Sequence, residues 1–173
     1  MSGQSRSLLV GADKIETLRH ICERNGVALC YVFGSQAENA YQMLLGGRVH
    51  IEDPLADIDV GVVLLDFDDL ARAHQLHLLY SRLYGSMADL FAPYELDLVL
   101  LQENHSVFQF EAVRGICVYE ASADVRTDYE ETVARKAADF RYVLETYLRE
   151  RTADLATRPE HPILREREGE ARA

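Results

Sequence analysis

The chain has 173 residues, which is enough for one compact domain with a sizeable core and too short for two ordinary domains. Its formal net charge of −11 opposes tight binding to a nucleic-acid backbone, which depends on clustered Lys and Arg, and favours a basic protein partner. No stretch approaches the roughly 18 consecutive apolar residues of a membrane span, and the N-terminus lacks the pattern of a secretion signal, so we expect a cytoplasmic protein with no membrane segment.

Hydrophobic periodicity and turn residues predict helices and strands that alternate along the chain, as in an α/β (α+β) fold with a small mixed β-sheet flanked by helices. In chain order we expect a helix over 14–23, a strand over 27–33, a helix over 35–45, a loop over 48–56, a strand over 57–64, a helix over 66–91, a strand over 95–101, a short helix over 107–113, a short strand over 116–119 and a long C-terminal helix over 124–156. We expect one domain over residues 1–157 and a polar, flexible tail over 158–173.

Gly34 and Ser35 separate the first expected strand from the helix that follows it. Ser35 and Glu38 match the S-x-x-E capping box that starts a helix. A glycine lets the backbone approach a ligand closely, and the start of a helix offers unpaired N–H groups to phosphate oxygens. We therefore assign Gly34 and Ser35 to triphosphate binding, while a purely structural role of Ser35 as a helix cap stays open.

Three aspartates in two expected strands are the candidates for chemistry. Asp57 and Asp59 lie two residues apart, so their side chains project from the same face of a strand. The same alternation puts Asp97 on one face of a later strand, and a neighbouring position in the sheet could bring it to the pair. Crowded carboxylates repel one another unless a cation neutralises them, and oxygen ligands suit Mg²⁺. The three aspartates are thus predicted metal ligands, the alternative being solvated strand residues.

A magnesium site of this kind is typical of phosphoryl chemistry, because the metal neutralises phosphate charge, aligns the attacking oxygen and stabilises the pyrophosphate that leaves. The sequence has no GxxxxGK[ST] phosphate cradle, and its only lysines are Lys14 and Lys136. A bound triphosphate would therefore depend on metal, backbone amides and arginine. Arg48 is one candidate for a phosphate contact.

The ordered set of Gly34-Ser35, Asp57-x-Asp59 and a later Asp97 resembles the signature of the minimal nucleotidyltransferases of the DNA polymerase beta superfamily. The resemblance implies a nucleotidyltransferase fold in which the three aspartates are catalytic and hold Mg²⁺. It also implies ATP as the nucleotide donor, bound at Gly34 and Ser35.

The resemblance extends over residues 14–150, because the segment 134–141 and the residues after it also look like the closing helix of that family. Two features depart from the compact members. A spacer of 21 residues separates Ser35 from Asp57, and Ala56 stands where a small hydroxyl residue commonly precedes the first acid.

Many members of this family are encoded beside HEPN-domain ribonuclease toxins and act as their antitoxins by transferring AMP from ATP to a toxin tyrosine. The resemblance therefore implies AMPylation of a HEPN-type toxin partner. The net charge and the lack of a long apolar run predict no direct contact to nucleic acid or membrane. Two alternatives stay open: an inactive module of the same fold that neutralises its partner stoichiometrically, and a nucleotidyltransferase acting on a small molecule such as an aminoglycoside. The sequence also leaves open a homo-oligomer.

Overall fold

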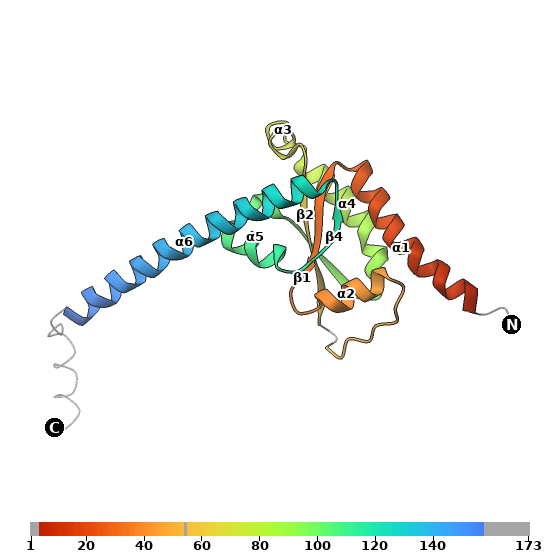
Figure 1. The fold of residues 1–173 in the computed structure, drawn as a ribbon, viewed down its shortest axis with the longest axis horizontal. Helices are drawn as coiled ribbons and strands as arrows, with labels where there is room; N and C mark the ends of the chain where they lie inside the picture. Colours follow the sequence, from red (N-terminus) through yellow and green to blue (C-terminus); the bar gives the residue numbers. More distant parts are fainter. Residues whose placement is uncertain (1–3, 54, 158–173) are drawn as a thin grey trace, which may run out of the picture. The chain divides into compact units, whose positions relative to one another are not determined.

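The computed structural model describes residues 4–53 and 55–157, in which helices and strands alternate as expected (Figure 1). α1 begins earlier than expected, at Gln4 instead of residue 14. Across the described residues no helix is long and apolar enough to cross a bilayer. The expected tail over 158–173 lies outside the described residues.

The elements in chain order are α1 (Gln4–Arg24), β1 (Val27–Phe33), α2 (Ala37–Leu44), β2 (Asp57–Leu64), α3 (Phe67–Arg72), α4 (Leu76–Phe91), β3 (Glu95–Leu100), the 3₁₀ helix η1 (Leu101–Glu103), α5 (Ser106–Val113), β4 (Ile116–Glu120) and α6 (Ala123–Thr157).

The four strands form one mixed sheet in the order β3-β2-β1-β4. β1 pairs antiparallel with both β2 and β4, and β2 pairs parallel with β3. Every residue of β1 is buried, as its continuous apolar run predicts for a strand covered on both faces. The expected small mixed sheet is confirmed, and β2 lies between β1 and β3.

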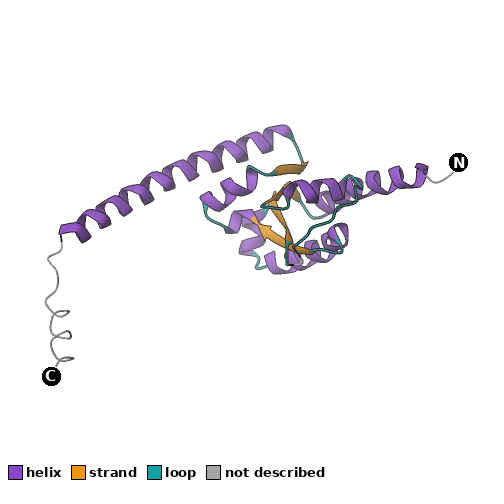
Figure 2. Ribbon diagram, turned by 90° about the horizontal axis from the view of Figure 1, so that it is seen from below, coloured by secondary structure: helices purple, strands orange, loops and turns teal. Residues whose placement is uncertain are grey.

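Helices cover both faces of the sheet (Figure 2). On one face, side chains of α1, α2 and α4 pack against Ile58 and Val60 of β2. On the other face, side chains of α5 and α6 pack against Tyr31 and Phe33 of β1. Because successive side chains of a strand point to opposite faces, the alternation along β2 decides which helices each of its residues meets.

α6 is attached to the sheet through its first half. Val133 and Ala137 are each 2% exposed, and the Tyr31 hydroxyl donates a hydrogen bond of 2.9 Å to Glu130 Oε1. Packing divides the chain into two units, Met1–Ala138 and Asp139–Ala173, so the second half of α6 belongs to a unit of its own. The domain boundary expected after residue 157 stays a prediction.

The single helix expected over 66–91 is wrong, because the structure has two helices, α3 and α4, separated by a short turn. His74 adopts a positive φ of 55° in that turn. The His74 N–H donates to the Ala71 carbonyl at 3.1 Å and the Gln75 N–H donates to the Leu70 carbonyl at 2.9 Å, which together form a Schellman C-cap. The sequence hides this break, since apolar residues keep helical spacing through it and the cap residue is not a glycine.

Replacing His74 with glycine is expected to stabilise the protein, because the left-handed conformation costs a residue with a Cβ about 1 kcal/mol and costs glycine almost nothing. His74→Gly should raise the free energy of unfolding by ~0.5–1 kcal/mol in a urea titration. The matched control is His20→Gly inside α1, which should lower it by a similar amount because glycine is a poor helix former. A loss of stability for His74→Gly would contradict the C-cap.

Candidate active site

The first residues of β2 bring the predicted aspartates to one end of the sheet. Asp57 and Asp59 alternate with buried apolar residues of β2, so both project from the sheet face that carries Phe33 and α5. Parallel pairing of β2 with β3 sets Asp59 directly beside Asp97, and antiparallel pairing with β1 sets Asp59 opposite Phe33. The structure thus brings Asp57, Asp59 and Asp97 together on one face.

Asp59 is the least exposed of the three: its side chain is half-buried, whereas Asp57 and Asp97 are exposed. Burial raises the pKa of Asp59 above the usual aspartate value, and the negative charges of Asp57 and Asp97 raise this pKa further. The pKa of Tyr80 in α4 is also raised, first by burial and then by the charge of Asp97. Nothing in the sequence marks Tyr80 as part of this region, since it belongs to an ordinary helical stripe.

Gly34 holds the turn after β1 against the carboxylate of Asp59. Its φ is +72°, a left-handed conformation that favours glycine. A Cβ at this position would overlap Asp59 Oδ2 and lie 3.1 Å from Asp59 Cγ. The absence of a side chain therefore lets the backbone of Gly34 lie against the carboxylate of Asp59. Glycine is the usual residue where the backbone approaches a ligand site this closely.

The capping box expected from Ser35 and Glu38 is wrong. α2 begins at Ala37 with Gln36 as its N-cap residue, and no side chain caps its first turn. The Ala37 N–H donates to the Gly34 carbonyl at 3.4 Å, so Ser35 lies inside a four-residue turn instead of at the helix cap. Ser35 is exposed, and its hydroxyl accepts a 3.3 Å hydrogen bond from Gln36 Nε2. The Ser35 hydroxyl is therefore not committed to capping.

The long spacer before β2 is anchored on the sheet face opposite to the aspartates. Ile51 is buried in the core formed with α1, α2 and α4, and its N–H donates to the Tyr94 hydroxyl at 2.9 Å. The same hydroxyl donates to the Val49 carbonyl at 3.3 Å. Arg48, expected as a phosphate contact, is exposed in this spacer and is not among the residues that line the pocket beside Gly34.

A pocket of about 500 Å³, here called the turn pocket, adjoins Gly34 and Ser35. Its opposite wall includes Arg114 and Gly115, between α5 and β4. A Cβ on Gly115 would lie 2.9 Å from Phe33 Cα, so the absence of a side chain lets this connection approach the end of β1. Nothing in the sequence marks Arg114, because only the pairing of β4 with β1 brings it near Gly34.

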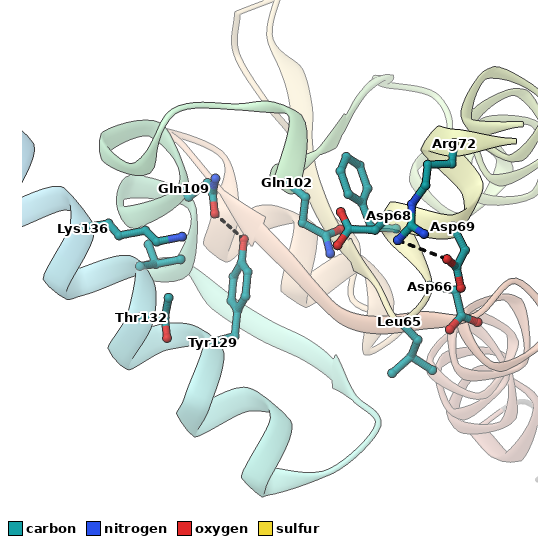
Figure 3. A pocket seen from close by; sticks show the side chains of 12 residues that line it. Leu65, Asp66, Asp68, Asp69, Arg72, Gln102, Gln109, Tyr129, Thr132 and Lys136 are labelled. Atoms are coloured by element: carbon teal, nitrogen blue, oxygen red, sulfur yellow. Dashed lines mark hydrogen bonds and ion pairs between the residues drawn. The ribbon is translucent and has the colours of Figure 1, made fainter. Parts of the chain in front are cut away.

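A second pocket, of about 560 Å³, lies at the other end of β2 (Figure 3). Asp66, Asp68 and Asp69 line it from the segment after β2, and Tyr129 and Lys136 line it from α6. The three predicted site aspartates lie where β2 and β3 begin, whereas this pocket follows the last residue of β2. The length of the strand separates the two regions, and we do not assign the second pocket to the site.

The donor set suits Mg²⁺ shared with a bound phosphate better than a closed metal cage. Within the side chains that the structure describes, no group of three or more His, Cys, Asp or Glu is gathered as a metal site. Mg²⁺ usually keeps several waters and is bound through one or two carboxylates together with substrate phosphates. Asp57 and Asp59, on one face of β2, fit that arrangement, and the charge of Asp97 lies close enough to affect Asp59.

Gly34→Ala is expected to destabilise the protein more than alanine at another left-handed glycine. Gly26→Ala is the matched control, because Gly26 has a φ of +66° and no atom within 4 Å of an added Cβ. Backbone strain should cost about 1 kcal/mol at either position. Alanine at position 34 must also displace the carboxylate of Asp59, for which we expect ~1–2 kcal/mol more in urea unfolding. Equal losses for the two variants would show that Gly34 does not pack on Asp59.

Removing the charge of Asp59 is expected to stabilise the protein at neutral pH. Because the pKa of Asp59 is raised in the folded state, the folded protein binds this proton more tightly than the unfolded chain does. The protonated carboxyl group therefore contributes its full stabilisation below the unfolded-state pKa. That contribution is lost as the pH rises through the folded-state pKa. Asp59→Asn should therefore raise the Tm by about 1–3 °C near pH 7, and the difference should shrink as the pH falls towards ~4.

The control for this measurement is Asp128→Asn, which removes an exposed aspartate of α6 and should change the Tm little. A lower Tm for Asp59→Asn than for wild type near pH 7 would contradict the crowding of carboxylates at the end of the sheet.

The chain is similar to a crystal structure of a toxin–antitoxin with AMP-PNP, at 20% sequence identity and a TM-score of 0.45; the match covers 83% of this chain and 98% of that one. It is also similar to a crystal structure of the toxin–antitoxin MntA-HepT, at 20% identity and a TM-score of 0.41, with 86% of this chain and 99% of that one covered. No curated protein matches the chain.

The family model described as Polymerase beta, Nucleotidyltransferase matches residues 16–124, a segment that contains Gly34, Ser35 and all three aspartates. This match spans more than half of the chain, and the expected family is confirmed. The chain belongs to the polymerase beta-type nucleotidyltransferase family.

Proposed function

We propose that the protein is a Mg²⁺-dependent nucleotidyltransferase that transfers AMP from ATP to a tyrosine hydroxyl of a HEPN-type toxin and acts in the cytoplasm as its antitoxin. The observation that carries the proposal is that Asp57, Asp59 and Asp97 lie on one face at one end of the sheet, where the charges of Asp57 and Asp97 act on Asp59 and Gly34 packs against the carboxylate of Asp59. Family membership supports transfer of a nucleotidyl group. The assignment of a protein as the acceptor of AMP is based on the resemblance to minimal nucleotidyltransferases.

Exposure and position argue for distinct roles of the site residues. Asp57 and Asp59 would hold Mg²⁺, which when bound supplies charge neutralisation at the phosphates. The backbone at Gly34 and the uncommitted hydroxyl of Ser35 would bind phosphate oxygens. Asp97, exposed on the neighbouring strand, would be a further metal ligand and the acceptor of the proton from the attacking hydroxyl.

The reaction exchanges a phosphoanhydride bond for a phosphoester bond. The acceptor hydroxyl oxygen forms a bond to the α-phosphorus of ATP, and the bond from that phosphorus to the oxygen bridging the β-phosphate breaks. The electron pair of the broken bond leaves with pyrophosphate, and the hydroxyl proton passes to Asp97. Because Asp57 and Asp97 are exposed, a tyrosine on the surface of another protein can approach this end of the sheet.

A protein acceptor agrees with the charge and the size of the chain. The net charge of −11 attracts a basic partner over distance, and it would also attract the amines of an aminoglycoside. The described residues form two units, one built around the sheet and one that contains the second half of α6. Among them there is no separate substrate domain to enclose a small molecule. We therefore favour the protein acceptor over the aminoglycoside.

The test is calorimetric titration of ATP into the purified protein with and without Mg²⁺, followed by incubation with the toxin and mass spectrometry of its tyrosines. We expect Mg²⁺-dependent binding and a toxin that gains AMP. Both should be lost in Asp57→Asn, Asp59→Asn, because the metal loses both carboxylates of β2. The matched control is Asp66→Asn, Asp68→Asn, which removes the same charge at the other end of β2 and should leave both intact. Wild-type protein that binds no ATP with Mg²⁺ would refute the proposal.

A second candidate function, stoichiometric neutralisation of a partner, is favoured by the second half of α6. Leu144 and Tyr147 are 44% and 54% exposed, although helical spacing puts them on the same helix face as the buried Val133 and Ala137. Such an apolar helix face can pack into the groove of another protein. If the Asp57→Asn, Asp59→Asn variant still neutralises the toxin and Leu144→Glu does not, stoichiometric binding is supported over AMPylation as the antitoxin mechanism.

A further inference from the structure

The proposed triphosphate site needs a positive charge that its own turn does not carry. No Lys or Arg occurs between Gly34 and Gly47. Of the two lysines, Lys14 donates a 2.7 Å hydrogen bond to the Leu90 carbonyl, and Lys136 lines the pocket at the other end of β2. A triphosphate carries several negative charges, and the neighbouring carboxylates repel it until cations compensate them. An arginine from another part of the chain can supply this charge.

The turn pocket brings one arginine to the required place. Gly34 and Ser35 contribute to one wall and Arg114 to another, although these residues lie far apart in the sequence. The arrangement depends on Gly115, since a Cβ there would overlap the Val32 carbonyl oxygen. Among the residues that line this pocket, Arg114 alone is basic.

Arg114 is held in a way that allows it to change partner. Its Nη1 lies 3.2 Å from Glu111 Oε2, three residues earlier in the chain, and the two side chains are 65% and 53% exposed. An exposed ion pair of this kind contributes little to stability, so breaking it costs little. Guanidinium groups bind phosphate oxygens through two parallel N–H donors, which a single surface carboxylate contact does not replace.

The other carboxylate of the turn pocket, Glu38, is engaged within its own helix. Glu38 Oε1 accepts a 3.0 Å hydrogen bond from Gln42 Nε2 in α2. Glu111 is therefore the carboxylate that competes directly with an incoming phosphate for Arg114. This competition gives opposite expectations for the two members of the ion pair.

We propose that Arg114 is a phosphate-binding residue of this site: it leaves Glu111 when ATP binds and contacts the phosphates across the turn pocket from Ser35. The proposal rests on the function proposed above, because it assigns a residue to the same nucleotide. It adds a cation from the end of α5 to a site whose other residues come from the turn after β1 and from β2 and β3.

The test is calorimetric titration of ATP with Mg²⁺ into full-length variants. Arg114→Gln should weaken binding about tenfold, because one charge-assisted contact is lost. Arg114→Lys should recover part of that loss, since it keeps the charge without the fork of donors. Glu111→Gln should bind ATP at least as tightly as wild type, because the competing carboxylate is gone. The matched control is Arg72→Gln, which removes an exposed arginine paired with Asp69 at 3.3 Å and should bind like wild type.

The two hypotheses can fail separately. If wild type binds ATP with Mg²⁺ and Arg114→Gln binds equally well, the role of Arg114 is overturned while the proposed function stands. If Arg114→Gln and Glu111→Gln weaken binding to the same extent, the ion pair has a structural role and the inference is again overturned. If wild type itself binds no ATP, the proposed function fails and the inference fails with it. Opposite effects of the two variants, with partial rescue by lysine, support the inference.

Discussion

The parallel register between β2 and β3 is the constraint on which the site depends. It sets Asp59 beside Asp97, on the face from which Asp57 also projects, so the negative charges of Asp57 and Asp97 raise the pKa of Asp59 where the strands begin. Repulsion between these charges costs folding free energy, and burial of Asp59 adds to this cost because a half-buried carboxylate loses part of its hydration. The apolar residues of β2 outweigh this cost, since all its residues from Val60 to Leu64 are buried and each large apolar side chain contributes roughly 1.5–3 kcal/mol. The strand is thus stable enough to carry a locally unfavourable charge cluster.

Two glycines bring backbone from both sides to the end of β1. Gly34 turns the chain against the carboxylate of Asp59, and Gly115 lets the connection between α5 and β4 approach Val32 and Phe33. Neither contact tolerates a Cβ without displacement of its neighbour. The turn pocket lies between these two glycine-containing segments.

The long spacer before β2 is anchored on the sheet face away from the aspartates. Ile51 ties the spacer into the core formed with α1, α2 and α4, on the opposite sheet face. The first half of α6 buries Val133 and Ala137, while its second half exposes apolar side chains. The buried residue of the spacer thus lies on the face opposite to Asp57 and Asp59.

The sequence by itself determined the strands of the sheet and the shared face of Asp57 and Asp59, because period-two alternation is a property of the extended backbone. It also predicted α5 and α6 to within a residue or so of their ends. It misassigned the start of α2 and the break at His74, where a local turn competes with a pattern that still has helical spacing. Only the tertiary structure decided that Asp97 lies beside Asp59 and that Arg114 lies near Gly34. Those neighbours are set by strand order and register, which depend on packing between segments far apart in the chain and leave no local signal in either segment.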